Sequence, residues 1–295
     1  MKNTNEKAEL TARVLGKCAD AMEPAGPWRW RCAVQNGARL SIAANLEEGF
    51  LHLACHPEET RDGICVPEHA LLGNGALAGG VKLALDESSS SLRLHTDIAV
   101  LEEKQLFDRF WWAIDGFHDG CLLLKSPAVR HNYAFTEPTD FGYGLGELLR
   151  EAAWPMAERG PNDFTAELDA DSATKARIRM SKTGVVLNLE LIPESPMEEP
   201  SRRALALFLL TASSKLRLVR AYAAKSEDGW SFGMQVSLPA APATEEINHA
   251  LAALSVAHGQ IAREARVLLD GAAACCYLAA RDTSTTNDYQ DKKEN

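Results

Sequence analysis

The fold is decided by residues 28–45, which read WRWRCAVQNGARLSIAAN. From Trp28 to Val34 an apolar residue occupies every second position, and this period of two is typical of a strand with one buried face. The dipeptide Asn36-Gly37 follows at once and supplies the positive φ angles of a tight type I′ turn. The chain is therefore predicted to fold back as a hairpin, with 38–45 as its second strand.

The elements around this hairpin complete the first half of the chain. Apolar residues at helical spacing predict a helix before the hairpin at 5–21, and alternation predicts a third strand after it at 50–56. Next come a short, glycine-weakened helix, two strands joined by a polar turn, and a longer helix, with predicted ranges of 67–79, 81–85, 92–98 and 101–118.

The second half of the chain repeats this order. Its predicted elements are helix 145–157, strands 164–169, 176–180 and 185–191, helix 198–213, strands 216–224 and 230–238, and a last helix from 243 to at least 269. The starts of matching elements are offset by 131 to 140 residues, which is compatible with one period of about 136. We therefore expect two tandem copies of an α-β-β-β-α-β-β-α unit.

The strands of each copy have one apolar and one mostly polar face. This pattern predicts an α+β fold, in which each copy is an antiparallel sheet with helices on one face. The predicted domains are residues 1–124 and 144–281. They are joined by a linker at 125–143, rich in proline and glycine, and followed by a polar flexible tail at 282–295.

Composition limits the possible partners. The 295 residues are 46% hydrophobic and 24% charged, as in an ordinary globular protein. With 31 Lys and Arg against 41 Asp and Glu, the formal net charge of −10 argues against nucleic-acid binding, which needs a positive surface. No apolar run reaches the roughly 18 residues of a membrane span, and the polar start of the chain does not resemble a signal peptide. We expect a cytoplasmic protein that binds neither nucleic acid nor membrane.

The sequence contains no motif that names a reaction. A Walker A motif, G-x-G-x-x-G and G-x-S-x-G are all absent. His52 and His56 share the outer face of one predicted strand, but at a rise of ~3.3 Å per residue they lie about 13 Å apart, too far to bind one metal ion. We therefore expect no catalytic residue, no metal site and no cofactor.

The order of elements and the acidic charge resemble the class I chaperones of type III secretion, the Tir-chaperone-like fold. The resemblance covers nearly the whole chain, once per half, although this chain departs from the family in its length and in the weak middle helix of the first copy. Family members are homodimers that hold an extended segment of a client protein and catalyse no reaction. The resemblance therefore implies a pseudo-dimer within one monomer, or a homodimer, that binds a client such as a secreted effector.

An uncovered sheet face could bind such a segment through outward-facing apolar residues. We expect these partner-binding residues at Val186, Val219, Ala221 and Ala223 in the second copy and at Phe50 in the first. Trp112 lies off the buried stripe of its helix and is expected to contact the other copy. The alternative is that these are ordinary apolar surface residues, which are common in folded proteins.

Two other classes of function stay open. One is a small-molecule enzyme or ligand-binding protein with its site in the cleft between the copies, where His95, Asp97 or His118 would act as general acid or base. The other is a structural or regulatory subunit.

Overall fold

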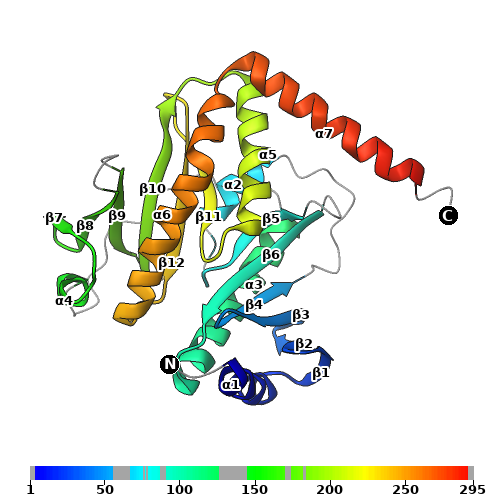
Figure 1. Cartoon of the computed structure of the whole chain (residues 1–295), viewed down its shortest axis with the longest axis vertical. Coiled ribbons are helices and arrows are strands. Elements are labelled where there is room, and N and C mark those ends of the chain that lie inside the picture. Colours follow the sequence, from blue (N-terminus) through cyan, green and yellow to red (C-terminus); the bar gives the residue numbers. More distant parts are fainter. Residues whose placement is uncertain are drawn as a thin grey trace.

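The computed structural model describes residues 4–55, 67–75, 77, 79–86, 91–125, 145–169, 174–181 and 184–291. In this part of the chain there are seven helices and two six-stranded sheets, whose strands all pair antiparallel (Figure 1). The fold is therefore α+β with two similar sheet domains, as the sequence predicts.

The two halves share one topology. The elements of the first half are α1 (Thr4–Cys18), β1 (Ala21–Gly26), β2 (Arg29–Asn36), β3 (Ala38–Glu47), β4 (Phe50–Cys55), α2 (Pro67–Asn74), β5 (Lys82–Asp86), β6 (Ser91–Ala99) and α3 (Glu103–Lys125). Those of the second are α4 (Leu145–Arg150), β7 (Met156–Gly160), β8 (Asp163–Asp169), β9 (Thr174–Ser181), β10 (Gly184–Ser195), α5 (Glu199–Lys215), β11 (Arg220–Lys225), β12 (Trp230–Leu238), α6 (Thr244–Val267) and α7 (Gly271–Asp291). The strand orders, β1-β2-β3-β4-β6-β5 and β7-β8-β9-β10-β12-β11, are equivalent.

The predicted order is wrong in one respect, because four strands rather than three precede the middle helix of each half. The additional strands are β1 and β7, each paired in a hairpin with the strand that follows it. No strand was predicted between the helix at 5–21 and the hairpin, and the helix predicted at 145–157 is shorter in the structure, since α4 ends at Arg150. A signal was present, since Gly26-Pro27 at the first turn recurs as Gly160-Pro161 at the second, offset by 134 residues.

The core lies between the sheets and the long helices. Helix α3 contacts β2 and β6, and α6 contacts β8, β10 and β12. The alternation that predicted the first hairpin is confirmed for the inward residues of β2 and β3, which are buried: Cys32, Val34, Leu40 and Ile42. It is wrong at Trp28, which precedes β2 and is 45% exposed. Helix α3 therefore packs on the apolar face of the β2–β3 hairpin. Burial of that apolar face is the main stabilising contribution in a sheet of this kind.

The contacts between the halves are reciprocal. Helix α2 of the first half packs against β11 of the second, α5 of the second half packs against β5 of the first, and α2 and α5 contact each other. Since α2 corresponds to α5 and β5 to β11, the two contacts are equivalent, as in a symmetric dimer. The halves are therefore arranged as a pseudo-dimer within one chain.

The C-terminal segment continues as a helix beyond α6. Helix α7 packs against α5, with the Phe208 and Tyr277 rings 6.4 Å apart, and then projects away from the body of the molecule (Figure 1). The tail predicted at 282–295 is helical up to Asp291. The linker predicted at 125–143 lies outside the described residues, except for Lys125 at the end of α3.

Candidate binding surfaces

Three of the residues predicted to bind a partner are buried in the second half, in β11 or directly before it. Val219, Ala221 and Ala223 have relative exposures of 0, 0 and 4%. Ala221 pairs with Met234, which pairs in turn with the core residue Leu189. The expectation that they face outward is wrong. Because both faces of β11 are buried, the alternation of residue types there does not distinguish the two faces.

Phe50 and Trp112 lie at the junction between the halves. The Phe50 ring is 5.7 Å from the His249 ring of α6, and the Arg217 guanidinium stands 4.9 Å from the centre of the Phe50 ring. Trp112 of α3 lines a cleft together with Ser237 of β12. Trp112 therefore lies between the two copies, where it was expected.

Val186 is half-buried on the outer face of β10. It pairs with Ser237 on one side and Arg179 on the other, so polar residues flank its side chain. The six predicted residues therefore do not form one surface: three are in the core, two are at the junction and one is on the open sheet.

Two buried cations occupy equivalent positions at the junction. Lys82 is the first residue of β5 and Arg220 the first of β11. Lys82 lies 3.2 Å from the Asp97 carboxylate and donates a hydrogen bond to the Leu216 carbonyl oxygen of the second half. Arg220 donates to two carbonyl oxygens of the first half, at 2.6 and 2.9 Å, and to the Ser237 hydroxyl at 2.7 Å. Burial lowers the pKa of Arg220 to about 9. Each half thus places one cation against the backbone of the other.

Asp97 is the carboxylate at the centre of this junction. Burial by itself would raise its pKa, but the Lys82 ammonium and the hydrogen bonds from His52 and from the Leu218 N–H, 2.7 Å away, hold the pKa of Asp97 well below its usual range. Asp97 is therefore ionised at neutral pH and connects strands of the first half to the second half.

The cleft between the halves is small. Its volume is about 40 Å³, and its walls include Asp97, Trp112, His249 and the ion pair of Arg109 with Glu246, in which the closest atoms are 2.9 Å apart. Of the three residues considered as acid or base, Asp97 lines this cleft, whereas His95 and His118 do not. Since one water needs roughly 10–15 Å³, the cleft holds only a few water molecules.

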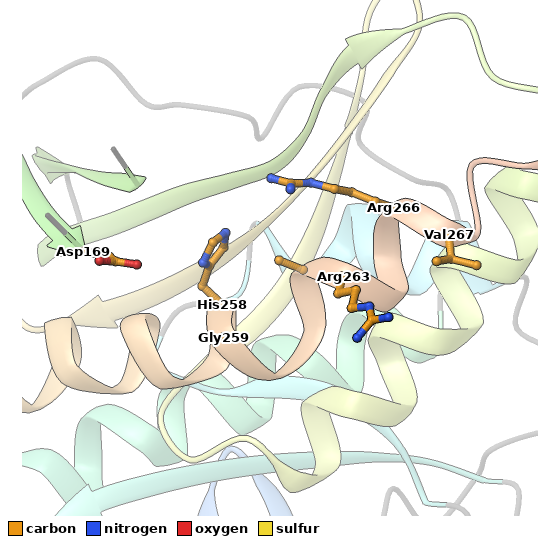
Figure 2. A pocket seen from close by; sticks show the side chains of 7 residues that line it. Asp169, His258, Gly259, Arg263, Arg266 and Val267 are labelled. Carbon is orange, nitrogen blue, oxygen red and sulfur yellow. The ribbon is translucent and has the colours of Figure 1, made fainter. Parts of the chain in front are cut away.

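A larger concavity lies along α6 in the second half. This α6 groove has a volume of about 580 Å³ and is lined by Asp169, His258, Gly259, Ala262, Arg263, Arg266 and Val267. Figure 2 shows Asp169, at the end of β8, across from His258, with Arg266 extending back toward His258 and Arg263 pointing away on the other side of α6. The groove is thus formed by a strand end and the last turns of a helix that are distant in sequence.

The α6 groove combines an apolar floor with positive charge. Val267 is 54% exposed, and a Cβ at Gly259 would meet no atom within 4 Å, so this stretch of α6 is open. Neither Arg263 nor Arg266 forms an ion pair with another described residue. Burial, and then the charge of Arg266, lower the pKa of His258 against the opposing effect of Asp169. The groove is therefore suited to a ligand that carries both apolar groups and carboxylates.

Sequence reasoning treated α6 only as a core helix and missed this groove. The buried residues of α6 include Ile247, Leu251 and Leu254, which form a complete apolar stripe facing the core. Packing in the core therefore does not explain apolar residues outside this stripe. Val256 and Val267 fall outside that stripe, at 58 and 54% exposure, and were the available signal.

No group of three or more His, Cys, Asp or Glu residues among the described positions could hold a metal ion. His56, considered above as a ligand, lies outside those positions. The described chain also has no helix of the length and apolarity that crossing a membrane requires. A scan against models of protein families and a search of curated proteins found no match to this chain.

Proposed function

We propose that this protein is a non-enzymatic, cytoplasmic client-binding module that acts as a monomer, related in organisation to the class I chaperones of type III secretion, and that it holds an extended segment of a client protein. Its two halves share one topology and pack through reciprocal contacts, which supports the comparison with a dimeric chaperone. The observation that carries the proposal is the α6 groove, an open concavity of about 580 Å³.

The chemistry of the groove favours an acidic client segment. Arg266 and Arg263 are exposed cations that attract carboxylates, and the floor at Gly259, Ala262 and Val267 accommodates apolar side chains. Exposed ion pairs contribute only about 0–1 kcal/mol each. Recognition in this groove therefore depends on apolar burial, while the charges determine which segments are accepted.

The rival function, a small-molecule site between the halves, has less support. Ligand pockets usually measure about 300–1,000 Å³, whereas the inter-half cleft measures about 40 Å³. Its Arg109 and Glu246 are already engaged in an ion pair with each other. Asp97 is likewise committed to Lys82.

The test is a titration of the isotope-labelled protein with a soluble peptide in which glutamate alternates with leucine and serine. Chemical-shift changes are expected at the amides of α6 and should weaken as salt is added. In the double variant Arg263→Glu, Arg266→Glu the shift changes at α6 should disappear. A matched control, Arg203→Glu, reverses an exposed arginine of α5 and should bind as the wild type does. Unchanged shifts at α6 with the wild-type protein, or equal binding by the double variant, would refute the proposal.

A further inference from the structure

The turn between β1 and β2 carries an unusual residue. Trp28 has a φ of +55° and a relative exposure of 45%. A bulky side chain in the left-handed region is a genuine outlier, and a tryptophan exposed to this extent leaves a large apolar surface in water. Trp28 is therefore unfavourable in the free protein for two reasons, its backbone conformation and the exposure of its side chain to water.

The second half provides an internal comparison. The equivalent turn, between β7 and β8, has Asn162 in the same place after Gly-Pro, with a φ of +56°. Asparagine is one of the few residues that adopts this conformation readily. The turn therefore forms without tryptophan, and the reason for Trp28 must lie in what its side chain does.

The strand that follows Trp28 presents unpaired positive charge. Arg29 and Arg31 of β2 are exposed, and neither forms an ion pair with another described residue. The one carboxylate opposite these arginines in the strand register is Glu23, which pairs with Arg31 across β1 and β2. In a chain with a net charge of −10, two free arginines beside an exposed tryptophan form a local positive site with an apolar centre. Tryptophan and arginine are the residues most enriched in binding hot spots.

We propose that Trp28, Arg29 and Arg31, here called the Trp28 hairpin, form a second docking site for an extended acidic segment of the client. Trp28 covers an apolar side chain of the segment, and the two arginines, which follow Trp28 along β2, pair with carboxylates of the same segment. This inference rests on the proposed function in that the occupant is a client segment. Figure 1 shows the β1–β2 hairpin apart from β8 and α6, so the Trp28 hairpin is a different site from the α6 groove.

The decisive variant is Trp28→Asn, which introduces the residue that the second half uses at the equivalent turn. It is expected to fold with an unfolding midpoint at or above that of the wild type, yet to bind the Glu-Leu-Ser peptide at the hairpin at least about tenfold more weakly. Leu122→Gln is the matched control, since it removes a similarly exposed apolar side chain, 56% exposed, from α3. This control should bind as the wild type does. Arg29→Glu with Arg31→Glu should weaken binding while Trp28 remains.

Calorimetric titration with a peptide too short to bridge the sites separates this inference from the proposed function. The wild type should bind two peptides, the Trp28→Asn protein one at the α6 groove, and the Arg263→Glu, Arg266→Glu protein one at the hairpin. If Trp28→Asn leaves the stoichiometry at two, the hairpin site is refuted and the groove stands. If the Arg263→Glu, Arg266→Glu protein still binds two peptides and the Trp28→Asn protein binds one, the groove is refuted as a binding site and the hairpin site stands. If the peptide with lysine in place of glutamate binds equally well, the acidic character of the client segment is refuted.

Discussion

Replacement of Asp97 by asparagine tests how the two halves are held together. The side chains of Asp97 and Lys82 are only 6 and 4% exposed, and they lie 3.2 Å apart. At that distance the attraction is about 5 kcal/mol for an effective dielectric constant near 20. Asparagine keeps an acceptor for the Leu218 N–H but leaves the Lys82 ammonium buried without a counter-charge. Removing one partner of a buried pair typically costs about 3–5 kcal/mol, so we expect a loss of about 3 kcal/mol in the free energy of unfolding.

Urea denaturation at neutral pH measures this loss. A double-mutant cycle shows how much of it comes from the interaction between Asp97 and Lys82. Lys82→Met together with Asp97→Asn removes both charges, and it leaves the Leu216 carbonyl without its donor and His52 without its carboxylate partner, so the double variant should lose about 2 kcal/mol. Ser237→Ala is the matched control in the other half, because Ser237 accepts from Arg220 as Asp97 does from Lys82. It should cost about 1 kcal/mol. A loss below about 1 kcal/mol for Asp97→Asn, or a double variant no more stable than Asp97→Asn, would refute the reasoning.

The same carboxylate predicts how stability depends on pH. The pKa of Asp97 is lower in the folded protein than its value of about 3.9 in an unfolded chain. The unfolded chain therefore takes up this proton first as the pH falls, and the stabilisation present above about pH 5 is progressively lost below it. The free energy of unfolding should decline less steeply with acid in the double variant than in the wild type. Parallel acid profiles would contradict this.

Two further substitutions test local backbone geometry. Trp28→Asn should raise the free energy of unfolding by about 1 kcal/mol, and the reciprocal Asn162→Trp should lower it by a similar amount. The reason is that a positive φ is less favourable for tryptophan than for asparagine. Melting temperatures of the two variants that shift in the same direction would argue against this. Gly79→Ala should destabilise the protein by more than about 2 kcal/mol, since its Cβ would lie 2.3 Å from the Trp112 carbonyl oxygen at a φ of +68°. Gly160→Ala, whose Cβ would meet no atom within 4 Å, should have little effect, and equal urea midpoints for the two alanine variants would contradict the reading of this contact.

The fold could be predicted from the sequence where local patterns are unambiguous. The β2–β3 hairpin has a clear alternation, and its two strands were identified with nearly correct ends. The predicted type I′ turn is wrong, because Asn36 still pairs with Ala38 and only Gly37 has a positive φ, of +78°. The additional strands β1 and β7 were missed because they are exposed edge strands with little alternation. Their hairpins depend instead on a Gly-Pro turn repeated in both halves.

The candidate sites were less accessible from the sequence. The α6 groove joins Asp169 at a strand end to residues from His258 onward, and no local pattern relates these two segments. The Trp28 hairpin lies in the segment whose alternation predicted a strand, but that alternation placed Trp28 on the buried face. Its exposure follows from its place at a turn with positive φ, which becomes visible only when β1 is recognised.

By itself, the sequence determined the doubling of the chain, the order of its elements apart from β1 and β7, the antiparallel pairing and the acidic charge, because periodicity and turn chemistry act over a few neighbouring residues. The tertiary structure alone decided which sheet faces are covered. The second half places Ala221 beside Asn74 of the first, whose side-chain amide donates to the Ala221 carbonyl oxygen at 2.9 Å across 147 residues of sequence. Contacts over such separations bury both faces of β5 and β11, and burial on both sides removes the alternation from which an outer face could be inferred.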